Sequence, residues 1–461
     1  MTPQIIDFSY LVAAVLFMLG LKRLSSPATA RAGNRLSMLG MAVAVIATLF
    51  KQEILSFTLI LVGLAIGTAI GAVAARRVKM TSMPQMIAIF NGCGGGASAL
   101  VAISEFYRVS PDFKSFMLAT LLLSVIVGLV TFSGSIVAFG KLRGSISGRP
   151  MVYTGQRAVN VLLAAVVIAM AIGVQLFPAG ATLFCGLILL TLLLGVLLVI
   201  PIGGADMPVV ISLLNSLSGV AVSMTGFVLG NNALIIVGSL VGAAGLILTK
   251  LMCEAMNRSL SNVLFGAFGA VKGGVAAAGV AAVTTGAVKS YTVEDAATML
   301  ENARTLIITP GYGMAVAQAQ HAVRELSDVL EEMGVQVRFA IHPVAGRMPG
   351  HMNVVLAEAN VPYDKLFAMD DINADFAHTD VALVVGANDV VNPAAKNVPE
   401  SPIYGMPILN VDQAKTVIVL KRSMRPGFAG IENDLFLRDN TMMVFGDAKG
   451  TLQKIISYIK G

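Results

Sequence analysis

Residues 181–202 read ATLFCGLILLTLLLGVLLVIPI, an apolar run without a charged side chain. An α-helix needs about 20 mostly apolar residues to cross the hydrocarbon core of a bilayer, so this run predicts a membrane-spanning helix. The same pattern recurs through the first half of the chain. We predict spans at residues 5–21, 36–50, 56–75, 83–104, 116–140, 158–177, 180–202, 207–229 and 233–253. Residues 1–260 are therefore expected to form a multi-span α-helical membrane domain of about nine helices.

The composition supports this interpretation. Of the 461 residues, 56% are hydrophobic and 13% are charged, whereas about a quarter of the residues in a soluble domain are charged. All four histidines lie after residue 320, so the chain changes from a lipid-like to a water-like composition. We find no basic stripe with interleaved aromatic residues and expect no nucleic-acid partner. Cys93, Cys185 and Cys253 lie far apart in apolar stretches and predict neither a metal site nor a disulfide.

The loop charges predict the orientation of the spans. The loops after the first, third and fifth predicted spans are the richest in cations, with Lys22, Arg23, Arg31, Arg35, Arg76, Arg77, Lys79, Lys141, Arg143, Arg149 and Arg157. Cytoplasmic loops carry an excess of Lys and Arg, so we expect these loops in the cytoplasm and the N-terminus outside. An odd number of spans then places the chain after residue 254 in the cytoplasm.

The pattern changes at Thr292, which together with Asp295 predicts a capped helix that ends near Asn302. Further on we predict a helix at Met314–Met333 that ends at Gly334, and strands at Thr305–Thr309, Val335–Ile341, Val381–Val385, Thr416–Leu420 and Met442–Phe445. Strands that alternate with helices imply a parallel sheet, so residues 291–461 are expected to form a soluble α/β Rossmann-like domain. Residues 261–290 are rich in Gly, Ala and Val, and we interpret them as a linker or hinge.

The first predicted strand continues directly into Gly311-Tyr312-Gly313, which opens a helix. In a dinucleotide-binding fold, such a turn lets the backbone approach the pyrophosphate at the helix N-terminus. The usual third glycine is replaced by Val316, and a tight turn without a ligand is the alternative. The strand before the turn and the helix after it favour a nucleotide site.

Two features favour NADP over NAD. An NAD site usually has an acidic residue at the end of the second strand, but here that strand ends at Ile341-His342. Lys421-Arg422-Ser423 follows a later strand directly, and two cations with a hydroxyl suit a 2′-phosphate. A solvated basic turn is the alternative for this tripeptide.

Other strand ends are also rich in glycine and in small or acidic residues, as a cofactor crevice requires. Gly386-Ala387-Asn388-Asp389 closes one strand, and Gly446-Asp447-Ala448 follows the last strand. The loop of residues 344–350 contains Arg347, whose side chain is long enough to reach a phosphate. For the histidines on either side of this loop, a loop-bracing role is favoured over a catalytic one.

Three polar residues in the membrane half are candidates for a proton path, namely Asn91, Asp206 and Asn215. Asp206 precedes Met207-Pro208, and capping of the next span is its alternative role. Small and polar residues share the helix faces of the two asparagines or form one on the last span: Gly94, Gly95, Ser98, Ser212, Ser216, Gly219, Gly238, Gly242 and Gly245. Close helix packing is the alternative role for these faces.

Six strings of this sequence carry a family resemblance: GGADMPVV (203–210), PGYGMAVAQAQ (310–320), HPVAGRMPGH (342–351), GAND (386–389), KRSM (421–424) and GDAK (446–449). Along essentially its whole length the chain resembles the beta subunit of the proton-translocating NAD(P) transhydrogenases. The resemblance implies a Re/Si-specific enzyme of the bacterial inner membrane, in which inward proton flow favours NADPH formation. It also implies an alpha subunit that carries NAD(H), and a dimer of the whole complex.

The resemblance further implies that the C-terminal domain binds NADP(H) in an orientation flipped relative to an ordinary Rossmann enzyme. Together with the glycine turn, the expected cofactor contacts are Gly311, Tyr312, Gly313, Val344, Ala345, Gly346, Arg347, Met348, Pro349, Gly386, Ala387, Asn388, Asp389, Val390, Gly405, Met406, Lys421, Arg422, Ser423, Phe428, Asp447 and Ala448. Hydride passes directly between the two nicotinamides in this family. We therefore expect no side chain to act as acid, base or nucleophile, and no metal.

The chain departs from some family members at two of these positions. Some relatives have a histidine where this chain has Asn91, so a titrating imidazole in the membrane would have to come from the partner subunit. Relatives often have a tyrosine where this chain has Phe428, so a hydroxyl contact is absent.

Two other classes of function stay open. A channel or transporter regulated by a nucleotide-sensing domain is disfavoured, because the spans contain no potassium-filter sequence and no evident inverted repeat. A membrane-anchored reductase with inert spans leaves the polar helix faces unexplained.

Overall fold

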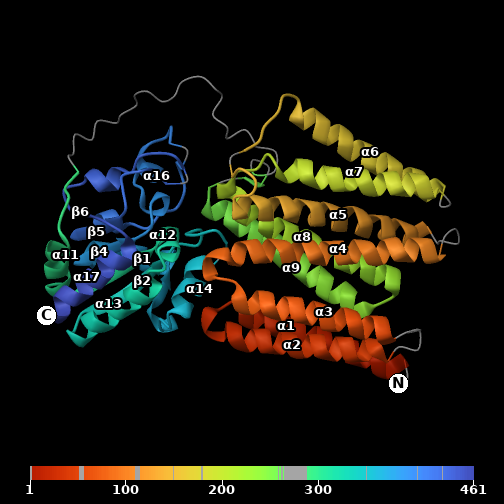
Figure 1. Ribbon diagram of the computed structural model, residues 1–461, viewed down its shortest axis with the longest axis horizontal. Helices are drawn as coiled ribbons and strands as arrows, with labels where there is room; N and C mark the ends of the chain where they lie inside the picture. Colours follow the sequence, from red (N-terminus) through yellow and green to blue (C-terminus); the bar gives the residue numbers. More distant parts are fainter. Residues whose placement is uncertain are drawn as a thin grey trace. The chain divides into compact units, whose positions relative to one another are not determined.

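The computed structural model describes residues 3–50, 57–109, 115–148, 150–177, 180–257, 259–260, 263, 288–348, 350–401, 403–427 and 429–461. These residues form two compact units, one of long helices and one built on a β-sheet, and Figure 1 draws both. Most of the predicted linker at 261–290 lies outside the described residues. The predicted domain limits at 260 and 291 therefore stay a prediction.

Nine helices among the described residues are long and apolar enough to cross a membrane, which confirms the predicted number of spans. They are α1 (Pro3–Leu24), α2 (Pro27–Leu49), α3 (Phe57–Arg77), α4 (Met83–Val109), α5 (Ser115–Arg143), α6 (Gln156–Leu176), α7 (Ala181–Val199), α8 (Met207–Leu229) and α9 (Asn232–Ala255). Several extend past the predicted spans into charged residues, as α3 does to Arg76 and Arg77. Long cationic side chains at a helix end can reach from the apolar layer to the polar interface.

Small residues let the central helices approach closely, because a glycine face brings two backbones together. Helices α4, α5 and α8 pack against one another, and a Cβ on Gly95 of α4 would lie 2.8 Å from the Gly128 carbonyl of α5. On α9, a Cβ on Gly238 would lie 2.7 Å from the Gly219 carbonyl of α8. A Cβ on Gly245 would lie 2.9 Å from the Cα of Ser216. These distances are too short for a side-chain carbon, so Gly95, Gly238 and Gly245 serve close helix packing, the alternative role given for these faces.

The second unit contains a parallel sheet of six strands in the order β3-β2-β1-β4-β5-β6. The strands are β1 (Thr305–Pro310), β2 (Gln336–Ile341), β3 (Leu366–Ala368), β4 (Val381–Val385), β5 (Thr416–Lys421) and β6 (Thr441–Phe445). The helices are α11 (Val293–Glu301), α12 (Tyr312–Val316), α13 (Gln320–Glu332), α14 (His351–Glu358), α15 (Met369–Ile372), α16 (Ala394–Asn397) and α17 (Ala448–Lys460). This arrangement confirms the Rossmann-like fold class that the alternating pattern predicts.

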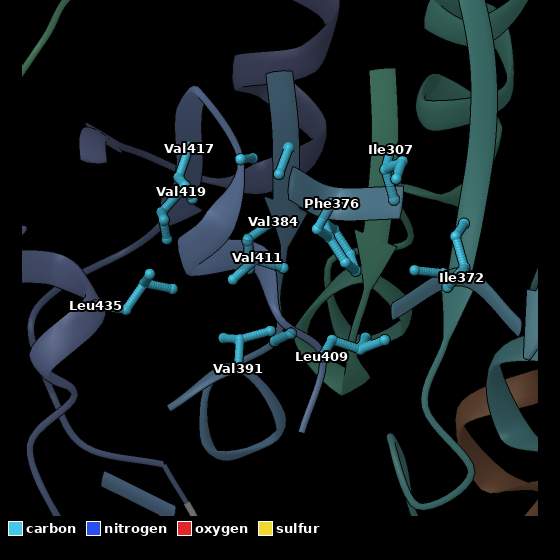
Figure 2. Close-up of a cluster of buried hydrophobic side chains, with 14 of the residues drawn as sticks. Ile307, Ile372, Phe376, Val384, Val391, Leu409, Val411, Val417, Val419 and Leu435 are labelled. Atoms are coloured by element: carbon cyan, nitrogen blue, oxygen red, sulfur yellow. The ribbon is translucent and has the colours of Figure 1, made fainter. Parts of the chain in front are cut away.

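Both faces of the sheet are covered. On one face, helix α17 packs against α11 and α13, and each of these three helices contacts a strand. On the other face, Figure 2 shows a buried cluster in which Phe376, Val411 and Leu435 from short segments surround alternate strand residues such as Val384 and Val419. Burial on both faces explains why the strands are continuous apolar runs rather than alternating ones.

Two local predictions about this unit have clear outcomes. The Thr292–Asp295 capping box is confirmed, since each residue's side chain accepts the other's backbone N–H. The single helix predicted at Met314–Met333 is wrong, because α12 and α13 are separate. Gln318 lies between them with a left-handed φ of 51°, and its side chain donates to the Ala315 carbonyl at 3.0 Å. The sequence pattern also missed β3 and the helices α14, α15, α16 and α17.

Candidate functional site

The turns that follow β1 and β4 lie backbone against backbone at the middle of the sheet. The Gly311 N–H donates to the Val385 carbonyl at 2.9 Å, and the Gly313 N–H donates to the Gly386 carbonyl at 2.9 Å. A Cβ on Gly313 would lie 2.8 Å from the Gly386 Cα, and Gly386 has a φ of +69°. Only glycine allows both the approach and the left-handed backbone. The strand order reverses between β1 and β4, which is where open α/β sheets bind ligands.

The loop after β2 reaches this turn through a cation and two rings. The guanidinium of Arg347 lies 4.5 Å from the centroid of the Tyr312 ring, close enough for a cation–π interaction. The Tyr312 and His351 ring centroids are 5.9 Å apart. The backbone N–H of Arg347 donates to Nδ1 of His351 at 3.0 Å. Gly346 has a φ of +133° within the same loop. The structure therefore brings the predicted loop, including the buried Ala345 and Met348 and the half-buried Val344, next to Tyr312.

His342 braces the start of this loop. Its ring is buried, Nε2 lies 2.8 Å from the Pro407 carbonyl, and Nδ1 accepts the Val344 N–H at 3.2 Å. Burial lowers the pKa of His342 to about 4, against a smaller raising effect of its bond to Pro407. The neutral ring thus donates through Nε2 and accepts through Nδ1, which fits the loop-bracing role favoured for this histidine.

The loop after β4 is joined to the segment after β5. The Ala429 N–H donates to a carboxylate oxygen of Asp389 at 3.0 Å. With its amide oxygen turned toward Gly427, Asn388 accepts the Gly427 N–H at 2.6 Å and the Lys421 ammonium at 3.3 Å. Burial lowers the pKa of the Lys421 ammonium, while the nearby Asp389 carboxylate raises it. The predicted residues Asn388, Asp389 and Lys421 are therefore close together.

The other predicted cofactor residues differ in their exposure and in the segments that carry them. Arg422 and Ser423 are exposed at the end of β5. Gly405 and the half-buried Met406 precede Leu409, whose N–H donates to the Val390 carbonyl at 3.0 Å. The predicted residues Pro349 and Phe428 lie outside the described residues.

The end of β6, where Asp447 and Ala448 are predicted cofactor contacts, is also the start of helix α17. The Asp447 side chain caps α17 by accepting the Gly450 N–H at 3.2 Å, and Ala448 is buried at the first position of that helix. The preceding Gly446 N–H donates to the Lys421 carbonyl at 3.1 Å. The end of β6 is thereby linked to the end of β5.

In the membrane helices, Asn91 connects α4 to α8. Its Nδ2 donates to the Ile211 carbonyl at 3.3 Å, and the Ser218 hydroxyl donates to the Asn91 carbonyl at 3.1 Å. The half-buried Asn215 lies on α8 between these two contacts. Asp206 occupies the N-cap position of α8, but its side chain makes no capping hydrogen bond. Asn91 and Asn215 therefore lie along one contact between α4 and α8, and Asp206 lies at the start of the same α8.

The neighbouring polar face of α8 contacts α9. The Ser216 hydroxyl donates to the Gly242 carbonyl at 2.6 Å, and the Thr249 hydroxyl donates to the Ser212 hydroxyl at 3.0 Å. These bonds satisfy the hydroxyl groups within the contact, which fits a packing role for this face.

A bundle of apolar helices in one chain with a parallel sheet of order β3-β2-β1-β4-β5-β6 defines a membrane protein that carries a dinucleotide-binding type of domain. The family model of the NAD(P) transhydrogenase beta subunit matches residues 6–458. Two relatives from Rhodospirillum rubrum, each named NAD(P) transhydrogenase subunit beta, are 52% identical over 465 residues, which is 99% of this chain and 99% of the relative. The chain belongs to the family of NAD(P) transhydrogenase beta subunits. The family name implies chemistry on NAD(P) and an alpha subunit as partner.

Proposed function

We propose that this chain binds NADP(H) in its sheet-containing unit and couples hydride transfer to proton movement through its membrane helices. The reaction is the reversible transfer of a hydride from NADH to NADP+, of Re/Si-specific type. The observation that carries the proposal is the paired glycine turn at the middle of the sheet, bordered by Arg347 and Lys421. A glycine turn at the start of a helix offers a place for a pyrophosphate. The two cations beside it can bind further phosphate charge.

The residues present fit NADP(H) by their chemistry. Glycines at 311, 313 and 386 let the turns after β1 and β4 pack backbone to backbone, since a Cβ at any of them would lie within 3 Å of the other turn. Lys421, Arg422 and Ser423 provide two cations and a hydroxyl for the 2′-phosphate, and the end of β2 has His342 instead of an acid. When bound, NADP(H) supplies the nicotinamide that gives or takes the hydride.

The side chains position rather than react. We assign to cofactor contact the loop of residues 344–349 with Tyr312, the loop of residues 386–390, and the pairs Gly405-Met406 and Asp447-Ala448. The segment from Lys421 to Phe428 is assigned a lid role, held by the bond from Ala429 to Asp389. Placement of two rings is enough for direct hydride transfer, so no acid, base or metal is assigned.

The partner assignments follow from the same proposal. The alpha subunit holds NAD(H), the complex is a dimer in the lipid bilayer, and the membrane is the bacterial inner membrane. The N-terminus lies outside and the NADP(H) unit in the cytoplasm. Asn91, Asp206 and Asn215 contribute to the proton path. Moving one charge through 100 mV supplies about 2.3 kcal/mol, enough to bias a two-state domain by tens of fold.

The binding proposal is tested with the purified full chain and the fluorescence of NADPH or NADH. We expect a clear preference for NADPH, and a loss of about tenfold or more in its affinity when Lys421 and Arg422 are both changed to Met. Lys454→Met, an exposed change on α17, serves as the control. Equal affinities of the unaltered chain for NADPH and NADH would refute the proposal.

The coupling proposal is tested with the complex of alpha and beta subunits in sealed vesicles. We expect NADH to reduce NADP+, and the rate to rise when an inward proton gradient is imposed. A nucleotide-regulated channel would give no hydride transfer. A membrane-anchored reductase would give hydride transfer at a rate that the gradient does not change.

A further inference from the structure

Lys141 is a buried cation of the membrane helices to which the proposed function gives no role. It lies in the last turn of α5, and it is 5% exposed. Its ammonium donates to the Ile200 carbonyl at 2.5 Å and to the Ile202 carbonyl at 2.6 Å. A charge removed from water is costly unless its surroundings compensate it, so these two bonds must stabilise the ammonium substantially.

The end of α7 explains why a cation is stable here. Helix α7 ends at Val199, and Ile200 is its C-cap residue. The last carbonyls of a helix have no partner inside the helix and together carry a partial negative charge. The Lys141 ammonium donates to the carbonyls of Ile200 and Ile202, which directly follow the end of α7. Its bonds therefore fix the chain where it leaves α7.

Two further bonds hold the same corner of the unit. The Gly204 N–H donates to the Gly148 carbonyl at 2.8 Å, after α5 has ended. The Gln85 side chain, in the first turn of α4, donates to the Leu142 carbonyl at 3.1 Å. The start of α4, the end of α5 and the turn from α7 to α8 are thus joined, and Lys141 provides the one charged side chain among these four bonds.

The turn fixed by Lys141 leads directly into the helix of the proposed proton path. Asp206 is the N-cap residue of α8, the Ile211 carbonyl accepts a hydrogen bond from the Asn91 amide, and Asn215 lies one turn further along α8. A displacement of residues 200–206 would move the start of α8 relative to α4. The position of Asp206 and the bond between the two helices both depend on this turn.

We propose that Lys141 is a positioning residue for the proton-coupled reaction. Its ammonium anchors residues 200–206 to the end of α5, and it thereby holds Asp206 and the first turns of α8 against α4. This inference rests on the proposed function, because it assigns a role within the same proton path. It requires a cation long enough to reach two carbonyls, which lysine and arginine provide and methionine does not.

The test uses the complex of alpha and beta subunits in sealed vesicles. The quantity measured is the ratio of NADP+ reduction rates with and without an inward proton gradient. In Lys141→Met we expect the stimulation by the gradient to fall about tenfold, because the turn loses its anchor. Lys141→Arg keeps the charge and several donors and should retain most of the stimulation. Arg143→Met, at an exposed position of the same helix end, should leave the ratio unchanged.

The ratio separates positioning from a merely structural cap. A cap would lower the thermal stability of the complex and reduce both rates together, with no change in their ratio. An unchanged ratio in Lys141→Met would overturn the inference, and so would equal losses in the Met and Arg variants of a fully assembled complex. If Lys141→Met does not assemble, Lys141→Gln keeps an amide donor and should give an intermediate ratio, whereas an unchanged ratio overturns the inference. An unaltered complex without any response to the gradient would instead reject the proposed function.

Discussion

At the edge of the sheet, burial keeps the His342 ring neutral, and backbone geometry requires a glycine at position 386. His342 is 1% exposed and joins the loop after β2 to Pro407, a link that depends on a neutral ring. Gly386 allows the turns after β1 and β4 to touch because it has no Cβ and a φ of +69°. Both features can be tested by changes that alter one property at a time.

The ring of His342 should stay neutral under mildly acidic conditions. Its folded pKa of about 4 lies below the unfolded value of about 6.5, so the folded state binds fewer protons. The stability that it contributes is fully present above the unfolded pKa and is lost as the pH falls through the folded pKa. NMR of labelled histidines should show the His342 ring neutral at about pH 5.5, which lies above its folded pKa of about 4. A His342 ring that is protonated at that pH would contradict the expectation.

The substitution Gly386→Ala should destabilise the chain more than Gly334→Ala does. Both glycines have a positive φ, but a Cβ at Gly386 would run into the backbone of Gly313 and Met314, whereas a Cβ at Gly334 meets nothing within 4 Å. Strained backbone alone costs on the order of 1–3 kcal/mol, and the collision adds to it. Thermal unfolding of the purified chain measures both effects. Equal shifts for the two variants would show that the contact between the turns is loose.

At the scale of elements, α8 is the helix that determines how the central membrane helices pack. One of its faces bonds to α4 through Asn91 and Ser218, and another contacts α9 through Ser216 and Gly219. A third contact is made to α5, where the Ser124 hydroxyl lies 2.8 Å from the Thr225 hydroxyl. Because three neighbours surround α8, a bulky residue on a close face has no space to move into.

The substitution Gly219→Val should therefore loosen the contact between α8 and α9. A Cβ at Gly219 would lie 2.8 Å from the Gly238 carbonyl, and overpacking of this kind costs about 1–3 kcal/mol. Gly67→Val on α3 is a matched control, since a Cβ there meets nothing within 4 Å. Size-exclusion chromatography after heating in detergent should show less monodisperse protein for the Gly219 variant only. Equal losses for both variants would refute the close contact.

At the scale of the whole molecule, the proposed coupling links polar residues of a membrane bundle to a nucleotide site in the second unit. The two kinds of residue lie in separate compact units of one chain. Changes in the membrane unit should therefore affect coupling without removing the capacity to bind the nucleotide.

The variants Asn215→Leu and Asp206→Asn test this separation. We expect each to lower proton-linked turnover in vesicles by about tenfold or more, since each removes a polar or ionisable group from the proposed path. NADPH binding by the purified chain should persist. Asn232→Leu, at the exposed start of α9, is the control and should leave turnover unchanged. Unchanged proton pumping in both variants would remove these residues from the path.

Local patterns in the sequence were sufficient to predict much of this fold. The length and apolarity of a run such as residues 181–202 define a spanning helix without reference to any other part of the chain. The capping pair Thr292–Asp295, the strand Val381–Val385 and the glycine turn after β1 are also short-range features. The break at Gln318 was missed, because a left-handed residue inside a helical pattern leaves no distinct composition signal.

By itself, then, the amino-acid sequence determined the membrane spans, the parallel α/β class and the strand ends that gather at the candidate site. Only the tertiary structure decided which distant groups meet. His342 reaches a carbonyl 65 residues away, and Lys141 reaches one 59 residues away. Hydropathy and strand patterns arise from neighbours along the chain, whereas these bonds depend on where the folded backbone returns, and no short stretch of sequence encodes that path.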